Sequence, residues 1–467
     1  MKTSSSHAPN HRLLVLILAA SGGAAVLGWG LNARSASSAA RTAPSPVALL
    51  AAIPSPSGTP TPTQAEIQKW KAKAQQSPEN PTHWLNLGDA LMQAARESAN
   101  HQYYDGAEKA YQQTLALAPQ KSDAMTGLAW VSGGRHQFPE SIAWAQKALV
   151  LNPSDSAAYG LIGDAQIEQG AYKEALVSYQ KMLDIRPDLS SYSRGAQVLY
   201  LLGDTRKAMW LMTKAIKAGG AHSENTAWCN AKLAEMLLGE GAVLPAENLL
   251  KDAQKVSPNS YAVLTGLGQL KMAKGLYPEA IALYEKAVTL APQHAGLVAL
   301  GDLYSLTKQE AKAEETFALV ERLHEEHKKL GSQDELYMAR FFAEHSHQLP
   351  RALALAEAHR EAKNAVAADT VAWCFYKNDK LPDAKAAIDR ALGAATPDSP
   401  VLFHAGMIYA KLGERETAKR YLYKALSRNP YFRVADAQLA AETLQALGST
   451  APPIPEGGVA LASGKSQ

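Results

Sequence analysis

The feature that most constrains this chain is a residue pattern that recurs at a spacing of about 34 residues. One copy places large, small and aromatic side chains before a proline, at Tyr159, Ile162, Gly163, Gly170, Tyr172, Ala175, Tyr179 and Pro187. Another copy repeats these residue classes at Leu264, Leu267, Gly268, Gly275, Tyr277, Ala280, Tyr284, Ala287 and Pro292. The pattern predicts stacked copies of one supersecondary unit, since a single unit cannot bury its apolar face alone.

The spacing within each copy is typical of two antiparallel helices. A central glycine such as Gly163 lets the partner helix approach closely, and Ala175 does the same from the second helix. The closing Pro187 ends the second helix, because proline disfavours helix at the residue before it. The chain is therefore expected to be all-α.

The pattern is uneven along the chain. It is clear in a first unit with Trp84 and Gly88 and in a last unit with Gly406 and Pro430. Residues 336–360 and 365–392 keep the period but few of the recurring residues. We expect about ten helix pairs within residues 64–447, with helices near 65–75 and 434–447 covering the apolar faces of the terminal units.

On these motifs, residues 81–430 resemble a run of tetratricopeptide repeats, and the arrangement is similar to that of bacterial envelope proteins with many such units. The resemblance implies a right-handed superhelical α-solenoid of about ten tetratricopeptide-type helix pairs with capping helices. It is specific for the fold and says little about function. It implies that the chain binds proteins or peptides.

The resemblance also implies that the first helix of each unit lines a concave groove. The side chains expected on the partner-binding side of this groove are Trp130, Tyr200, Tyr337, Phe341, Trp373, Tyr376, Phe403 and Met407, with Asp302 and Glu344 among the polar ones. Exposed aromatic groups there would anchor a peptide or a helix. The alternative is that Phe341, Trp373 and Tyr376 pack between neighbouring repeats.

The N-terminus predicts a membrane segment. Residues 1–12 are polar and carry Lys2 and Arg12, and an uncharged apolar run follows within residues 13–32. Such a run can span a bilayer, and the positive flank places residues 1–12 in the cytoplasm. We expect a single-pass cell-membrane protein whose repeat domain is extracytoplasmic. The sequences at 19–21 and 37–39 also tolerate cleavage, so a signal peptide with a periplasmic or secreted product is the alternative.

Two segments have the composition of unstructured chain. Residues 33–63 are rich in Ala, Ser, Pro and Thr and predict a semi-extended linker between the membrane and the repeats. Residues 448–467 predict a disordered tail.

Composition and motifs favour binding over catalysis. The 47 basic and 44 acidic residues are nearly balanced, which argues against nucleic acid as a partner. Cys229 and Cys374 are expected to be core residues, outside any disulfide framework. His324 and His327 lack the spacing of a zinc-protease helix and are expected on a solvated face, so no metal site is predicted. Phosphate-loop and nucleophile-elbow motifs are missing from the sequence, so we expect no cofactor and no enzyme activity.

The function that the sequence favours is a membrane-anchored protein–protein interaction scaffold or assembly factor. The alternative is an accessory glycan-binding factor for polysaccharide or cell-wall synthesis, in which sugars stack on Trp373 or Tyr376.

Overall fold

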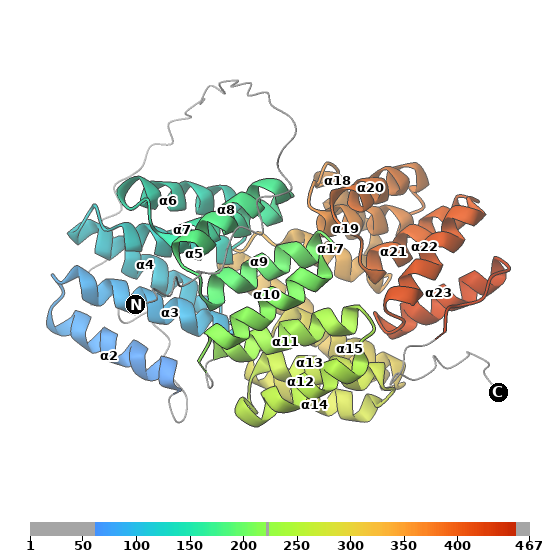
Figure 1. Cartoon of the computed structure of the whole chain (residues 1–467), viewed down its shortest axis with the longest axis horizontal. Coiled ribbons are helices and arrows are strands. Elements are labelled where there is room, and N and C mark those ends of the chain that lie inside the picture. The colour runs from blue at the N-terminus through green and yellow to red at the C-terminus, as the bar shows by residue number, and fades with distance from the viewer. Residues whose placement is uncertain (1–60, 221–223, 454–467) are drawn as a thin grey trace, which may run out of the picture.

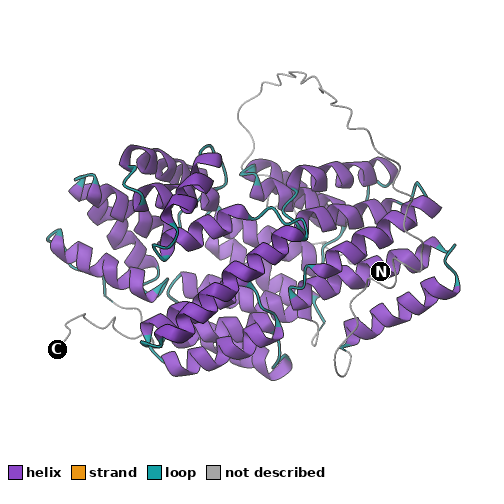
Figure 2. Cartoon of the chain, turned by 180° about the vertical axis from the view of Figure 1, so that it is seen from behind, coloured by secondary structure: helices purple, strands orange, loops and turns teal. Residues whose placement is uncertain are grey.

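The computed structural model describes residues 61–220 and 224–453 (Figure 1). These residues form helices joined by short turns, and no strand occurs among them (Figure 2). Helices α3 to α22 form ten successive antiparallel pairs, with the single helices α2 and α23 at the two ends. The predicted all-α architecture of about ten stacked helix pairs is confirmed.

The helices of the N-terminal half are α2 (Pro62–Gln76), α3 (Pro81–Ser98), α4 (Gln102–Leu117), α5 (Ser122–Gly134), α6 (Phe138–Leu151), α7 (Ser156–Glu168), α8 (Tyr172–Ile185), α9 (Leu189–Leu201), α10 (Thr205–Ala218), α11 (Glu224–Gly239) and α12 (Val243–Val256). Those of the C-terminal half are α13 (Tyr261–Ala273), α14 (Tyr277–Leu290), α15 (His294–Leu306), α16 (Glu310–Lys329), α17 (Glu335–Glu344), α18 (Leu349–Ala358), α19 (Ala365–Lys377), α20 (Leu381–Ala394), α21 (Ser399–Lys411), α22 (Arg415–Arg428) and α23 (Val434–Ala446).

Helix boundaries follow from local sequence. The side chain of Asp155 accepts hydrogen bonds from the first amides of α7, and Asp398 does the same for α21. Gly170 ends the turn between α7 and α8 with φ of +75°, a conformation that favours glycine. A Cβ at Gly170 would lie 2.5 Å from the backbone of Lys363, so glycine is required there for packing as well as for the turn.

Within the pairs, a glycine on the first helix contacts an aromatic ring on the second. A Cβ at Gly163 of α7 would lie 2.4 Å from Cε1 of Tyr179 of α8. The hydroxyl of Tyr179 donates a hydrogen bond of 2.8 Å to Asp164. Gly88 and Tyr111 pack in the same way in the first pair. The predicted role of the central glycines, close helix approach, is confirmed.

The odd-numbered helices form an inner layer. Neighbouring odd-numbered helices such as α17, α19 and α21 pack against one another, whereas the even-numbered helices pack chiefly on odd-numbered ones. An odd-numbered helix contacts the odd-numbered helices of the neighbouring pairs. Helices that approach one another in this way lie on the concave side of the array. The largest core cluster spans α15 to α23 and includes Phe341, Phe342, Trp373, Phe375 and Phe403.

The array also contacts itself across one turn of the superhelix. Hydrogen bonds join residues that are 188 to 197 positions apart in the sequence. They link Gln137 to Gly331 O (3.1 Å), Asn364 to Ile167 O (2.9 Å), Ala365 N to the Tyr172 hydroxyl (2.7 Å) and Arg428 to Glu240 (3.2 Å). In Figure 1, the ends of α7 and α8 accordingly face the group of α17 to α19. Repeats of the N-terminal half therefore support repeats of the C-terminal half directly.

Within residues 61–220 and 224–453, no helix combines the length and the apolar character needed to cross a membrane. The predicted membrane segment, residues 13–32, lies outside the described residues, as do residues 1–12, most of the linker and residues 454–467. Helix α2 begins at Pro62, slightly before the expected start of the repeat domain at residue 64, because Thr61 and Gln64 form a capping box there.

Candidate functional site

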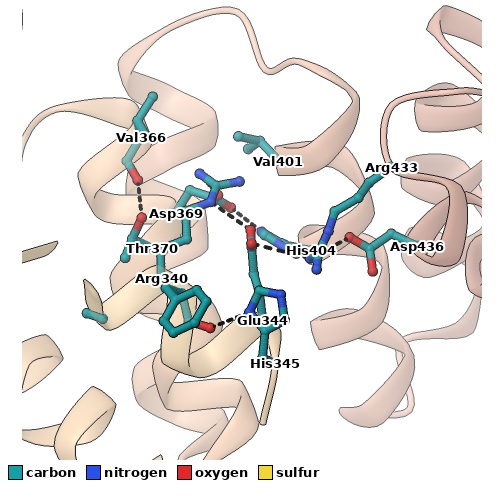
Figure 3. Close-up of polar contacts among 12 residues, drawn as sticks. Arg340, Glu344, His345, Val366, Asp369, Thr370, Val401, His404, Arg433 and Asp436 are labelled. Atoms are coloured by element: carbon teal, nitrogen blue, oxygen red, sulfur yellow. Dashed lines mark hydrogen bonds and ion pairs between the residues drawn. The ribbon is translucent and has the colours of Figure 1, made fainter. Parts of the chain in front are cut away.

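Charged side chains gather on the inner layer of the last repeats, over α15, α17, α19, α21 and α23. We call this group the inner charge network; its members are Asp302, Arg340, Glu344, His345, Asp369, His404, Arg433 and Asp436. In Figure 3, charged side chains from α17, α19 and α21 and from the start of α23 converge on one another. Sequence segments that are distant from one another thus contribute to a single polar site.

Arg340 of α17 lies at one end of the inner charge network. Its Nε donates to Glu344 Oε1 at 2.8 Å, and its Nη1 lies 3.6 Å from Asp369 Oδ2. The other oxygen of Asp369 lies 2.8 Å from Nδ1 of His404 (Figure 3). Because Asp369 is 0% exposed, its charge is balanced by these neighbours rather than by water.

Arg433 joins the network from the turn before α23. Its guanidinium lies 3.2 Å from Asp302, 3.4 Å from Glu344 and 3.2 Å from Asp436. Asp302 also lies 2.8 Å from Nε2 of His345. One arginine therefore connects three helices, α15, α17 and α23, through carboxylates.

The network holds its central carboxylate ionised. Burial would raise the pKa of Glu344, but the guanidinium groups of Arg340 and Arg433 outweigh it and lower that pKa to about 2. At the edge of the network, burial raises the pKa of Asp436. Burial also lowers the pKa of Lys377, whose ammonium group lies 5.5 Å from the centre of the Trp373 ring.

Two buried polar atoms on α19 have unused hydrogen-bonding capacity. Asp369 Oδ2 and Trp373 Nε1 are buried and have no hydrogen-bond partner among the described residues. They lie one helical turn apart, on the same helix face. Asp369 Oδ2 still lies 3.6 Å from Arg340 Nη1 and is balanced by that charge, whereas the Trp373 N–H is an unsatisfied donor inside the core.

The structure places the predicted groove residues in two groups. Phe341, Trp373 and Phe403 are core residues with exposures of 3%, 5% and 0%. The half-buried Tyr337, Tyr376 and Met407 pack against the same core. The half-buried Trp130 and Tyr200 pack against separate clusters in the N-terminal half.

The expectation that Phe341, Trp373 and Phe403 are exposed along the groove is therefore wrong. These rings pack between the neighbouring helices α17, α19 and α21 in one shared core, as the alternative interpretation predicted for Phe341 and Trp373. Trp373 stacks on Tyr376 with ring centroids 4.6 Å apart and on His404 at 4.1 Å. Binding of a partner at the remaining residues stays a prediction.

Sequence reasoning missed most of the inner charge network. The repeat pattern predicts Asp302 and Glu344 at groove positions. Asp369 and His404, however, lie on helices whose sequences are mostly apolar. Their pairing depends on the contact between α19 and α21, which the sequence pattern of neither helix shows. The recurrence of an ionisable residue at the middle of successive first helices was the available signal.

The expected solvated face of α16 is also wrong at two positions. His324 and His327 are only 5% and 7% exposed, because α16 contacts the first helix pair across the superhelical turn. They line a cavity of about 280 Å³ together with His101, His136 and His294. Among the described residues, no cluster of His, Cys, Asp and Glu side chains has the geometry of a metal site.

The two cysteines are free and buried, as expected for core residues. Burial raises the pKa of both Cys229 and Cys374 to about 12. Both thiols are therefore protonated and unreactive at neutral pH.

Comparison with known families agrees with the helix pairs. A tetratricopeptide repeat profile matches residues 91–156, 133–190 and 243–295, and a second profile of the same description matches residues 399–432. The chain carries tetratricopeptide repeats. The matched segments include the pairs α5–α6, α7–α8, α13–α14 and α21–α22, while α17 to α20, where the pattern is weak, lie outside them.

Solved structures of similar fold include PilF of Pseudomonas aeruginosa, at 17% identity over 43% of this chain and 91% of that chain, with a TM-score of 0.35. Yeast Tom70 has 13% identity over 82% of this chain and 91% of its own, with a TM-score of 0.36. The human IFIT1 dimer with m7Gppp-AAAA has 14% identity over 71% and 77%, with a TM-score of 0.47. At these values the likeness concerns the repeat fold alone. A comparison with curated proteins finds no match.

The repeat type bears on the general class of function. Tetratricopeptide repeats mediate protein–protein interactions, and families of this fold are generally non-catalytic. Which partner a particular array binds depends on its own inner surface.

Proposed function

We propose that this tetratricopeptide array is a membrane-anchored scaffold that binds a basic peptide segment of a partner protein along the inner face of α15 to α23. The observation that supports this proposal is the inner charge network. Repeat helices can stack through apolar contacts alone, and buried charges add little to stability. A network of charges along several first helices therefore favours a role in binding.

The composition of the network favours a basic partner. Its four carboxylates, those of Asp302, Glu344, Asp369 and Asp436, face two guanidinium groups and two imidazoles, so they outnumber the permanently charged cations of the network. An excess of carboxylates on a binding surface attracts a positively charged segment and disfavours an acidic one. Asp302 is 24% exposed, so a ligand can reach its carboxylate without unfolding a helix.

Half-buried apolar side chains beside the inner charge network favour a peptide over a free cation. The half-buried Met407 and Tyr376 supply these apolar contacts.

Glycan binding receives no such support. A sugar would need a free aromatic face on Trp373 or Tyr376. These rings stack on each other, Trp373 also stacks on His404, and the ammonium group of Lys411 lies over the Tyr376 ring.

The membrane anchor is proposed from residues 13–32 of the sequence, with the linker 33–63 holding the array away from the bilayer. A cleaved signal peptide with a periplasmic or secreted array remains the alternative.

Crosslinking in native membranes tests the proposal. The tagged full-length protein is crosslinked, solubilised and purified, and the recovered chains are compared between the unaltered protein, Asp302→Asn and the matched control Glu416→Gln. Glu416 lies on the outer helix α22 with its side chain 85% exposed, so the control removes a carboxylate outside the groove. We expect Asp302→Asn to lose a defined set of partners and Glu416→Gln to keep it.

Direct binding then identifies the groove. A basic peptide from a recovered partner is titrated calorimetrically, and Asp302→Asn is expected to weaken it by about tenfold, or about 1.4 kcal/mol. Equal affinities of Asp302→Asn and the unaltered protein for this peptide would reject the inner face as the site.

Recovery of glycan or of glycan synthases in the crosslinking experiment would favour the alternative function. Deletion of residues 1–32 is expected to release the protein from membranes, and continued membrane association of that variant would reject the anchor.

A further inference from the structure

Four histidines form one cluster between the first helix pair and the seventh. We call His101, His294, His324 and His327 the histidine seam; His101 precedes α4, whereas the others belong to α15 and α16. His101 and His327 stack with ring centroids 3.5 Å apart and planes 6° from parallel. His294 meets His327 edge-on at 5.2 Å and His324 at 5.9 Å. The four rings therefore join two repeats that are far apart in the sequence.

The local backbone disfavours a positive charge on two of these rings. His101 is the N-cap residue of α4, and His294 is the first residue of α15. The N-terminal end of a helix carries a partial positive charge, so an imidazolium is destabilised there. Stacked imidazolium rings such as those of His101 and His327 would also repel each other.

The ring nitrogens lack the partners that would stabilise a cation. Nδ1 of His101 and Nε2 of His294 are buried without a hydrogen-bond partner among the described residues. Arg96 lines the same cavity but already pairs with Glu224 of α11. Asp334 lies 4.0 Å from His136, a fifth histidine at the edge of the cavity.

Titration of the seam follows this geometry. Burial, with the neighbouring imidazoles, lowers the pKa of His101 and of His294 to about 3 and that of His327 to about 4. Burial also lowers the pKa of His324. Other charged groups facing the seam do not reverse these shifts: the cations Arg135, Lys328 and Arg351 add to them, and the carboxylates Asp334, Glu325 and Glu326 oppose them.

We propose that the histidine seam is a proton-sensitive lock, which holds the first repeat against the seventh while its rings are neutral and releases it when they are protonated. The proposal rests on the position of the cluster between the two repeats and does not depend on which partner the array binds. Opening exposes the four rings to water, where imidazolium is well solvated.

The direction and steepness of the pH dependence follow from linkage. An exposed histidine has a pKa of about 6.5, so the open form binds more protons than the closed form below that pH. Closure is therefore fully favoured above about pH 6.5 and weakens as the pH falls. Three rings with strongly lowered pKa values change the closed-to-open ratio by about a thousandfold per pH unit. A closed form favoured about a thousandfold would thus open near pH 5.5.

A distance measurement across the seam tests the lock. Spin labels are placed on exposed positions of the full chain, at Gln112→Cys on α4 and Glu315→Cys on α16, while the buried Cys229 and Cys374 stay unlabelled. Pulsed electron resonance distances and far-ultraviolet circular dichroism are recorded between pH 7.5 and pH 4.5. We expect the distance to increase near pH 5.5 with uptake of about three protons, while the helical signal is kept.

Non-titrating variants make the test specific. His101→Gln combined with His327→Gln is expected to leave about one proton in the transition, and the single variant His294→Gln about two. His347→Gln is the matched control, because that exposed histidine pairs with Glu321 outside the seam, and it is expected to behave like the unaltered protein.

If the double variant does not fold at pH 7.5, the single variant His294→Gln decides the test. A distance that is constant down to pH 4.5, an unchanged proton number in His294→Gln, or opening that coincides with loss of helix would overturn the lock.

Discussion

The first repeats and the last repeats of this array are held together differently. In the pairs α3–α4 and α7–α8, a glycine of one helix receives a tyrosine ring of the other, and the tyrosine hydroxyl donates to an aspartate one residue after the glycine, at 2.8 Å in both pairs. In α17 and α19 no glycine occupies that position. There, phenylalanine and tryptophan rings fill one large core, and the inner charge network covers it.

The difference reflects what each region packs against. The first repeats bury tyrosine rings against glycines of the same and of the next helix pair, as Tyr111 packs on Gly88 and on Gly127, and their cores are separate clusters. The last repeats share one cluster from α15 to α23 and are also supported by the earlier turn, through contacts such as that of Ala365 N with the Tyr172 hydroxyl. Glycine is thus found where a side chain of the second helix packs on it, and it is replaced in α17 and α19, where aromatic rings of the first helices fill the shared core.

The largest effect is expected from removing an aromatic ring of the shared core. Phe403 is fully buried at the junction of α21 with the rings of Trp373 and Phe432. Phe403→Ala should lower the free energy of unfolding by about 3–5 kcal/mol, because it removes apolar contacts and leaves a cavity. Denaturant unfolding followed by circular dichroism measures this loss.

The matched control for Phe403 is Tyr423→Ala, since Tyr423 is an aromatic residue on the next helix, α22, and is 44% exposed. It should change the free energy of unfolding by less than about 1 kcal/mol. A small loss for Phe403→Ala, close to that of the control, would contradict the assignment of this ring to the core.

An intermediate effect is expected in the glycine–tyrosine packing of the first repeats. Gly163→Ala places a methyl group 2.4 Å from the Tyr179 ring and should destabilise the array by about 1–3 kcal/mol. The double variant Gly163→Ala with Tyr179→Leu should lose less unfolding free energy than the sum of the losses in the two single variants, because the smaller side chain removes the clash. Thermal unfolding of the four proteins gives this coupling energy.

Gly393→Ala is the matched control, because a Cβ at Gly393 of α20 meets nothing within 4 Å. It should be neutral or stabilising by up to about 1 kcal/mol, since alanine favours helix over glycine. Strict additivity of Gly163→Ala and Tyr179→Leu would show that the two side chains are not packed as described.

Much of the fold is predictable from local pattern, but the site is not. Gly163, Tyr179 and Pro187 encode a helix pair within a single stretch of sequence, so the period, the all-α class and the glycine contacts can be predicted. The burial of Phe341 and Trp373 depends instead on contacts among α17, α19 and α21. The pattern of a single helix carries no information about these contacts.

The contacts across the superhelical turn were equally hidden from the sequence. His324 and His327 lie in a strongly charged stretch of α16, which locally predicts a solvated face. Their burial follows from contact with His101, a residue more than two hundred positions earlier in the chain. The angle at which successive repeats stack decides whether such contacts form, and small differences in that angle accumulate along the array.

The smallest of these effects concerns Glu344 in the inner charge network, and it depends on pH. The pKa of Glu344 is lowered from the ordinary value of 4.5 to about 2, so its ionised form stabilises the fold above pH 4.5, and this contribution is lost as the pH falls toward 2. Glu344→Gln should therefore cost about 1–2 kcal/mol at pH 7, because Arg340 and Arg433 lose one charged partner but keep others. The difference in unfolding free energy between the two proteins should shrink by pH 3.

Both proteins contain the histidine seam, so its titration cancels in this difference. A difference that stays constant from pH 7 to pH 3 would show that the carboxylate of Glu344 is not held ionised by the two arginines, and that the last repeats rely on their aromatic core alone.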